Sequence, residues 1–231
     1  EMIHRGKTAI LSELEYWKDR GEDRRILLVV NSYRDVEAVY RALENVDELS
    51  ERFLVLDRDG KKEKAISPVE LINLSQYEAD IFVAPLLSIN RGYNILQRNS
   101  NRSLFGSLFF MARPYPTPNH LPYFIPYLHA MLPSFLNRIE KKGLIGVEGL
   151  RELRKHSNTV FRQFYQGDQT WTNLGDDEKS VLAWYTLIPI YQTIGRLMRG
   201  GTKARIFYVD AKFYHSFHGE KTMLEVWKEL L

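Results

Sequence analysis

Five short runs of aliphatic, β-branched and aromatic residues constrain the fold of this chain more than any other feature of its sequence. They cover residues 26–30, 53–56, 81–84, 108–111 and 206–209. A run that is apolar at successive positions is typical of a strand buried on both faces of a parallel sheet. Helical patterns separate the runs, so the sequence predicts an open, mostly parallel α/β sheet with helices on both faces.

Helical patterns surround the first strands. Residues 8–20 carry apolar side chains at helical spacing. After the first strand, Asp35 is expected to cap a helix that continues to Leu43. After the second strand, Ser67 as cap and Pro68 at the first helical position predict a further helix.

About ninety residues separate the fourth strand from the fifth, far more than a crossover helix needs. They contain helical patterns over residues 120–142, 147–166 and 177–199. We therefore expect a single domain over residues 1–231, with a helical insertion over residues 114–180 before the last core strand.

The composition narrows the classes of function. The 231 residues include no cysteine, which excludes disulfides, thiol nucleophiles and cysteine-ligated metals and favours a reducing, cytoplasmic setting. The net charge of +3 is too small to identify a nucleic-acid partner by itself. The apolar stretch over residues 121–136 is too short and too interrupted by proline to span a bilayer. Because the sequence begins with Glu1 and no signal peptide, we expect a processed product or a fragment.

The most informative motif covers residues 192–201 and reads QTIGRLMRGG. On a helix, Arg196 and Arg199 share a face and can present two guanidinium groups to one polyanion. Gly195 allows close backbone approach beside them, and the glycine pair that follows suits a helix end with positive φ. A basic last turn with a glycine cap explains the same residues without a ligand.

This string resembles motif VI of superfamily 2 helicases, Q-x-x-G-R-x-x-R, at all four defining positions. In that family, the arginines of a C-terminal RecA-like domain reach across a cleft to the phosphates of ATP bound on the other RecA-like domain. The resemblance implies that Gln192 and Gly195 contact the ATP site. It also implies that Arg196 and Arg199 act in catalysis as arginine fingers, with Arg199 the closer to the γ-phosphate.

A second string includes the third strand and the loop that follows it, where the family has its motif V. It begins at Asp80 and contains Ser88, Arg91, Gly92 and Asn94. The resemblance implies that Arg91, Gly92 and Asn94 contact the nucleotide and that Ser88 contacts nucleic acid. The family usually has aspartate at the position of Asn94, whose amide can hydrogen-bond a ribose but cannot accept as a carboxylate does. An ordinary loop with a turn glycine explains the string equally well.

A third string resembles motif IV, a strand that ends in a polar turn and a helix. Asn31, Ser32 and Tyr33 follow the first strand, at the end of a parallel sheet where ligands bind. Backbone amides and side-chain hydroxyls at the start of a helix suit a nucleic-acid phosphate, so these residues are expected to contact the nucleic acid. The Pro-rich residues 114–118 after the fourth strand, and Asp210 at the end of the fifth, resemble the DinG/XPD-type branch of the superfamily.

The sequence contains no phosphate-binding loop of the type G-x-x-x-x-G-K-[ST] and no acidic metal-binding box after a strand. The resemblance therefore implies that an N-terminal RecA-like domain of the same chain, missing from this sequence, binds most of the ATP and Mg²⁺. This chain alone would not hydrolyse ATP, and no metal site is expected in it. Its other partner would be single-stranded nucleic acid, with DNA favoured over RNA and no membrane involved.

Two other functions remain open. One is a non-catalytic helicase-like module that docks nucleic acid or protein partners. The other is a nucleotide- or sugar-binding α/β enzyme that uses the turn at Gly200 and Gly201 as a phosphate cradle. The helix expected around residues 151–165 combines basic and aromatic residues that can clamp a single strand, although a solvated basic face explains it more simply.

Overall fold

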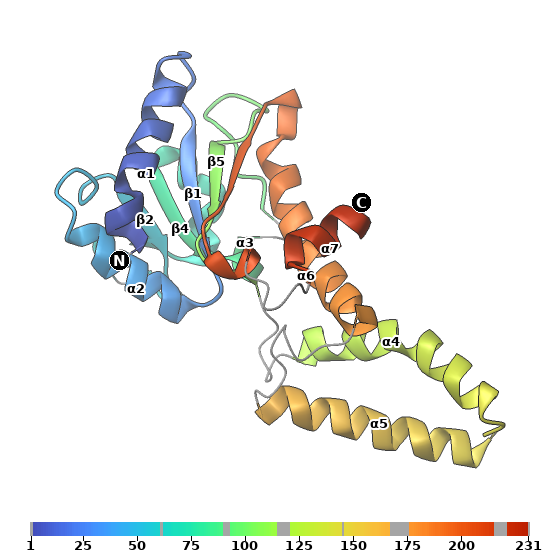
Figure 1. The fold of residues 1–231 in the computed structure, drawn as a ribbon. Coiled ribbons are helices and arrows are strands. Elements are labelled where there is room, and N and C mark those ends of the chain that lie inside the picture. Colours follow the sequence, from blue (N-terminus) through green and yellow to red (C-terminus); the bar gives the residue numbers. More distant parts are fainter. Residues whose placement is uncertain are drawn as a thin grey trace. The chain divides into compact units, whose positions relative to one another are not determined.

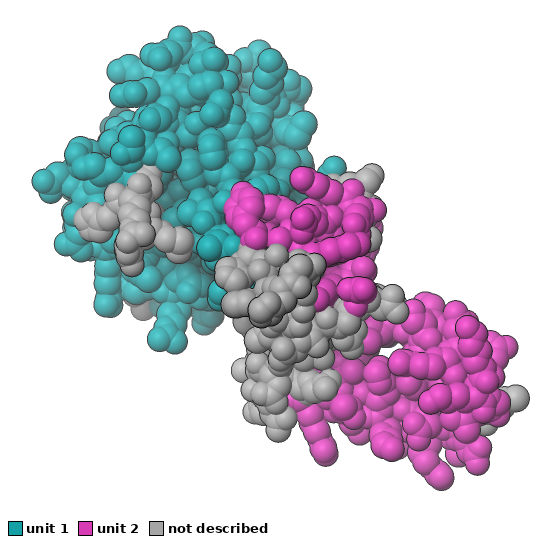
Figure 2. Space-filling model, in the orientation of Figure 1, with its two compact units in different colours: residues 1–114, 189–212 teal, residues 115–188, 213–231 magenta. Residues whose placement is uncertain are grey.

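A computed structural model describes residues 2–60, 62–89, 93–114, 121–144, 146–166, 176–214 and 221–230. The chain forms two compact units, which Figure 2 shows in different colours. The first unit comprises Glu1–Pro114 and Pro189–Lys212 and contains the sheet. The second comprises Tyr115–Ile188 and Phe213–Leu231, and its described part is helical. The insertion expected over residues 114–180 falls largely within the second unit.

Six strands form one open sheet in the described part of the first unit. They are β1 (Arg25–Val30), β2 (Phe53–Leu56), β3 (Ala65–Ile66), β4 (Ile81–Pro85), β5 (Phe105–Phe110) and β6 (Arg205–Tyr208). Their order is β3-β2-β4-β1-β5-β6, and every pairing is parallel. The expected open α/β sheet is confirmed, and the arrangement is consistent with a RecA-like fold.

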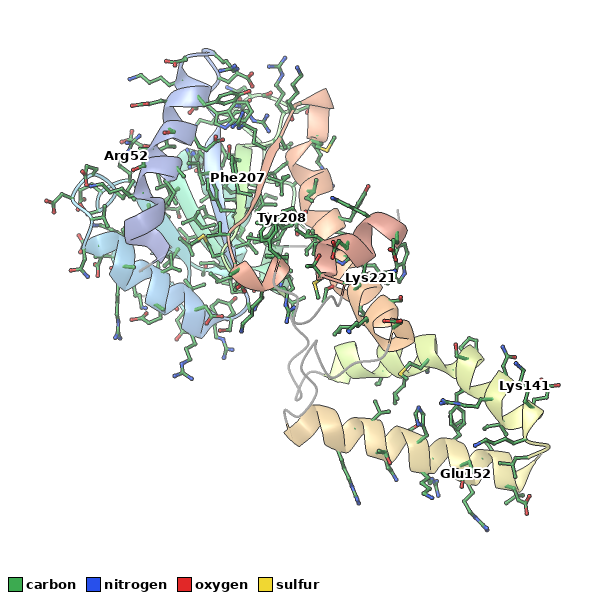
Figure 3. The ribbon with its side chains drawn as sticks, viewed as in Figure 1. Arg52, Lys141, Glu152, Phe207, Tyr208 and Lys221 are labelled. Carbon is green, nitrogen blue, oxygen red and sulfur yellow. The ribbon has the colours of Figure 1, made fainter. Side chains whose placement is uncertain are left out.

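The burial of each strand follows its place in the sheet. Residues 26–30 of the central strand β1 are all at most 2% exposed, as a run of five apolar residues requires. Strand β6 lies at the edge and is half-buried. There Phe207 and Tyr208, labelled in Figure 3, stack on Phe109 and Phe110 of β5 with ring centroids 4.4 and 5.5 Å apart.

Two strands differ from the expectation. Strand β3 has only two residues, and a pair as short as Ala65–Ile66 gives no apolar run to detect. Strand β5 begins at Phe105, three residues before the predicted start at residue 108. The prediction began too late because Gly106 and Ser107 interrupt the apolar pattern.

A contact with helix α1 (Met2–Lys18) explains both of these interrupting residues. The indole nitrogen of Trp17 donates to the hydroxyl of Ser107 over 2.7 Å, and that hydroxyl donates to the buried carboxylate of Glu13 over 2.6 Å. A Cβ atom on Gly106 would lie 2.4 Å from the ring of Trp17, so only glycine fits there. The polar group in the core is thus satisfied, and the missing side chain makes room for the indole.

Helices cover both faces of the sheet. Helix α1 and helix α2 (Tyr33–Glu44) lie on one face (Figure 1) and pack on a core that includes Ile26, Leu28 and Phe53. Leu27 points to the opposite face, since successive side chains of a strand alternate. The last two turns of helix α6 (Asp176–Leu197), which belong to the first unit, approach that face, where Thr193 and Leu197 border the same pocket as Leu27.

The start of α2 requires a correction. Asp35 was expected to cap this helix, but the N-cap residue is Ser32, whose hydroxyl oxygen accepts from the amide of Asp35 over 3.2 Å. The same hydroxyl donates to the carboxylate of Asp35 over 2.8 Å. Asp35 therefore lies in the first turn, where its charge favours the positive end of the helix dipole.

The helix expected after Ser67 is present as a 3₁₀ helix, η1 (Pro68–Gln76), which begins with a capping box. In that box the carboxylate of Glu70 accepts from the amide of Ser67 over 2.8 Å. A one-turn helix, α3 (Leu86–Ile89), follows β4 directly. It places Ser88 close to the carboxyl ends of the strands.

The second unit contains helices α4 (Leu121–Lys141) and α5 (Val147–Gln166), the first part of α6, and α7 (Met223–Leu230). The expected helices over residues 120–142 and 147–166 are confirmed, whereas α7 was not anticipated. Phe135 of α4 stacks on His156 of α5 with ring centroids 4.8 Å apart, so these helices pair as a hairpin. Trp227 of α7 donates to the carbonyl of Ala183 on α6 over 2.8 Å. Among the described helices, none has the length and apolar character needed to cross a membrane.

Candidate functional site

The polar turn after β1 lies at the carboxyl edge of the sheet, because all the strands are parallel and end on the same side. The side-chain amide of Asn31 donates to the carbonyl of Arg113, which follows β5, over 2.9 Å. The hydroxyl of Ser88 donates to the phenol oxygen of Tyr33 over 3.2 Å. Asn31, Tyr33 and Ser88, three of the residues expected to contact nucleic acid, therefore lie at this edge of the sheet, and Ser32 caps α2 beside them.

Arg58 belongs to the same edge and was not singled out from the sequence. It follows β2, and its guanidinium carbon lies 5.0 Å from the centre of the Tyr33 ring. Arg58 is exposed and Tyr33 is half-buried, so a planar cation and an aromatic ring face solvent together. The only available sequence signal was its place directly after a buried strand.

Asp210 joins the carboxyl ends of β5 and β6. Its two carboxylate oxygens accept from the backbone amides of Arg113 over 2.7 Å and of Lys212 over 2.9 Å. The guanidinium of Arg113 also donates to the carbonyl of Lys212 over 3.2 Å. The aspartate expected from the helicase resemblance therefore closes this edge of the sheet through backbone hydrogen bonds.

The two arginines of the strongest motif lie close together but not on one helix. Helix α6 ends at Leu197, so Arg196 is in its last turn, and Arg199 begins the short 3₁₀ helix η3 (Arg199–Gly201). The helix expected over residues 177–199 is thus two residues shorter at its end. The proximity of Arg199 lowers the pKa of Arg196, in addition to the larger lowering by burial.

Arg196 also contacts the segment that resembles motif V. Its guanidinium donates to the backbone carbonyl of Tyr93. Tyr93, Ile89 and both arginines line a pocket of about 20 Å³ in the first unit. That volume is room for roughly one water molecule, so the described residues of this unit do not enclose a nucleotide beside the arginines.

The pKa shift of Arg196 indicates which ligand would suit the pair. A guanidinium remains protonated in proteins, so burial and the neighbouring cation raise the free energy of the charged site instead of removing the charge. An anion with several oxygens, placed against both arginines, would relieve the repulsion between their charges. The arrangement therefore fits a phosphate group presented from outside the unit.

Two glycines beside the arginines have different roles. Gly200 has a φ of +72°, and a Cβ atom there would lie 2.9 Å from the carbonyl oxygen of Asn101. Gly200 therefore allows the chain to turn immediately after Arg199. At Gly195, by contrast, no atom of the described residues lies within 4 Å of the Cβ position, so the close approach expected there involves none of these neighbours.

Helix α3 connects the two groups of candidate residues. Ser88 contacts Tyr33 at the carboxyl edge, and the next residue, Ile89, lines the arginine pocket. A one-residue separation on a four-residue helix leaves little freedom between these contacts. A displacement of α3 would therefore affect both the strand-end residues and the arginine pair.

The remaining predicted site residues have fewer contacts. Gln192, Gly195 and Asn94 are exposed. Arg91 and Gly92 lie outside the described residues. In the described segments, no cluster of three or more histidine, cysteine, aspartate or glutamate side chains is placed to hold a metal ion.

Arg24 was missed by the sequence analysis, although it holds the end of α6. Its buried guanidinium donates to the carbonyl of Leu197, the last residue of that helix, over 2.9 Å. It also donates to the carbonyls of Phe105 and Lys203. Burial is the main cause that lowers the pKa of Arg24. Because its three partners are remote in sequence, Arg24 looked like an ordinary charge before a strand.

A larger cavity, of about 420 Å³, lies at the amino edge of the sheet. Its walls include three arginines that are engaged within the fold. Arg25 donates to the carbonyls of Leu74 and Tyr77, Arg98 donates to the carbonyls of Ser75 and Gln76, and Arg52 pairs with Asp80 at 2.7 Å. These bonds tie η1 to the strands, so the cavity walls have a structural role.

Comparison with known proteins gives no relative: the chain matches no family model, no curated protein and no solved structure. Its function is therefore inferred from its residues and their geometry.

Proposed function

We propose that this chain is the second motor domain of a cytoplasmic, ATP-dependent helicase or translocase. Arg196 and Arg199 act on ATP held, together with Mg²⁺, mainly by an N-terminal RecA-like domain. The carboxyl edge of the sheet forms half of the groove for a single strand, with DNA favoured over RNA.

The observation that carries this proposal is the arginine pocket. Arg196 is half-buried, lies close to Arg199, and donates to the carbonyl of Tyr93. Two adjacent cations at the rim of a pocket too small for a nucleotide favour a phosphate that is bound by another domain. Arginines placed in this way stabilise the charge that develops on a transferred phosphoryl group.

The residues at the carboxyl edge of the sheet are suited to binding single-stranded nucleic acid. Tyr33 with Arg58 offers a ring and a planar cation for stacking, and Asn31 and Ser88 add hydrogen-bonding groups. Stacking on aromatic rings and on guanidinium planes tolerates every base, as a motor that moves along a strand requires. Helix α3 gives a direct route by which closure around ATP would shift these residues.

The test is strand-stimulated ATP hydrolysis by the longest native polypeptide that contains residues 1–231. Replacing Arg196 or Arg199 by alanine is expected to lower stimulated turnover by about a thousandfold or more. Arg41→Ala removes an exposed arginine that pairs with Glu37 on α2 and is the matched control, for which turnover should not change. Unaltered turnover in Arg199→Ala would overturn the assignment.

A second candidate is a non-catalytic module that docks nucleic acid or a protein. It is favoured by Asn94, which is exposed and carries an amide where helicases have a carboxylate. A folded, strand-binding polypeptide without any stimulated hydrolysis would support this candidate. Tight binding of a mononucleotide by this chain alone would instead favour an unrelated nucleotide-binding enzyme.

A further inference from the structure

The helical hairpin formed by α4 and α5 carries more positive charge than the whole chain. Residues 121–166 contain seven basic and three acidic residues, which gives a net charge of +4. The complete chain has a net charge of +3, so the other residues sum to −1. The basic excess is therefore a property of this hairpin and not of the protein in general.

The exposed charge of α5 falls on one face of the helix. Its four basic residues are all exposed: Arg151, Arg154, Lys155 and Arg162. At 3.6 residues per turn they lie within about 100° of arc and extend over roughly 17 Å of the helix axis. We call these four residues the basic stripe. The two acidic residues of the helix, Glu148 and Glu152 (the latter labelled in Figure 3), lie on one margin of the stripe.

The opposite margin of the basic stripe is apolar and exposed. It carries Leu150 and Phe161, which are 66 and 37% exposed, while Val147, which is 72% exposed, lies within the arc of the stripe at the start of the helix. The face away from the stripe packs on α4: Val160 is buried, and a Cβ atom on Gly149 would lie 3.4 Å from Ile139. The hairpin thus buries part of its apolar surface internally and leaves a basic surface open to solvent, with the partly exposed ring of Phe161 beside it.

We propose that the basic stripe of α5 is a binding surface for the phosphate backbone of single-stranded nucleic acid. The inference rests on the proposed function, in which such a strand is the track of the motor. Four cations along one side of a rigid helix match a line of phosphates and release counterions on binding. Phe161 at the margin offers a ring on which a base can stack.

A lipid surface fits less well. A helix that lies in a membrane interface buries a broad apolar face, with its charges on the opposite side. In α5 Val160 is already buried and His156 stacks on Phe135 of α4, and the exposed residues include the four cations of the basic stripe. A phosphate backbone satisfies the exposed charges without requiring an apolar environment.

The test measures binding of a labelled oligo(dT) strand to the full chain by fluorescence anisotropy, without ATP, over a range of KCl concentrations. Replacing all four stripe residues by glutamine should weaken binding at least tenfold. It should also reduce the slope of log affinity against log salt by about 2 to 3, since each phosphate contact on a single strand contributes roughly 0.7.

The matched control removes the same charge elsewhere. Lys18, Arg20, Lys203 and Lys228 are exposed and lie outside the hairpin, and their replacement by glutamine gives the same net charge. This control should change affinity by less than about twofold, because long-range attraction between exposed charges is screened by salt. Equal losses in both variants would overturn the proposal, because net charge alone would then explain binding.

Two further variants and one further ligand distinguish the possible outcomes. The combined change Arg151→Lys, Arg154→Lys and Arg162→Lys keeps the charges and should retain the salt slope. Phe161→Ala should weaken binding of single strands by about tenfold, as expected for one stacked base, and bind duplexes unchanged. Stronger binding to phosphatidylserine vesicles than to the strand, lost in the glutamine variant, would assign the stripe to membranes.

No ATP hydrolysis enters these measurements, so they can fail independently of the proposed motor function. Loss of turnover in Arg199→Ala together with unchanged strand binding by the glutamine variant would keep the motor and reject the basic stripe.

Discussion

In the sheet unit, the guanidinium of Arg24 is buried and donates to three backbone carbonyls, whereas Arg151 and Arg162 on α5 are exposed to solvent. Arg196 belongs with Arg24, since it is partly desolvated and donates to the carbonyl of Tyr93. The same residue type therefore occurs in two environments: one at least partly buried and directed by backbone carbonyls, the other exposed to solvent.

The difference in environment separates two tasks. A desolvated guanidinium held by carbonyls has a fixed direction, and its interaction with an anion is little screened by salt. Such a group is suited to a reaction in which charge develops at a defined point. Exposed arginines on a helix attract a polyanion over a longer range, but salt weakens them and their geometry varies. The same substitution should therefore have a different effect in an arginine held by carbonyls and in an exposed arginine of α5.

The largest effect is expected for Arg24→Met. Removing this group takes a donor from the carbonyls of Phe105, Lys203 and Leu197, of which Leu197 keeps the hydroxyl of Thr202 as a donor. The free energy of unfolding of the sheet unit should fall by about 3 kcal/mol. Native-state hydrogen exchange of the amides in β1 and β5 measures this unit separately from the helices.

Arg162→Met makes the same chemical change on α5. It should change the free energy of unfolding, measured by hydrogen exchange of the amides in α5, by no more than about 0.5 kcal/mol, because the side chain is exposed. Similar losses of protection in both variants would remove the distinction between held and exposed arginines.

A smaller contrast concerns the two glycines beside the arginine pair. Gly200→Ala should destabilise the sheet unit by about 2 kcal/mol, because φ is +72° and the carbonyl of Asn101 lies 2.9 Å from the new Cβ atom. Gly195→Ala should leave stability unchanged or raise it by about 0.5 kcal/mol, since it lies in a helix with open space around it.

Gly195→Ala should nevertheless lower strand-stimulated turnover by about tenfold, because a ligand from the companion domain would meet the new methyl group. The variants are compared by hydrogen exchange for stability and by steady-state hydrolysis for turnover. Full activity in Gly195→Ala would argue against a ligand approaching the helix at this point.

The sequence predicted those parts of the fold that depend on local pattern. Continuous apolar runs gave β1, β2 and β4 to within one residue, and helical spacing gave the bounds of α5. The pattern failed where one contact overrides it. Gly106 and Ser107 hid the start of β5 because their environment is set by Trp17, ninety residues away in sequence.

The candidate site was predicted only in part, for a related physical reason. The motif strings indicated Arg196, Arg199, Asn31, Tyr33 and Ser88, which the structure brings into two linked groups. Arg24 and Arg58 were missed because their roles come from partners remote in sequence, such as Leu197 at the end of α6 and Tyr33 at the start of α2. The cap of α2 was assigned to Asp35 rather than Ser32, since both residues are good caps and only backbone geometry distinguishes them.

The most direct test of the central claim is chemical rescue of Arg199→Ala in the intact motor. Single-turnover hydrolysis of ATP, stimulated by a single strand, is measured with and without added guanidinium. If the side chain of Arg199 supplies a cation to the transferred phosphoryl group, the variant should be inactive and guanidinium should restore part of its turnover. Turnover equal to that of the intact motor, or a folded inactive variant that guanidinium does not restore, would contradict the claim.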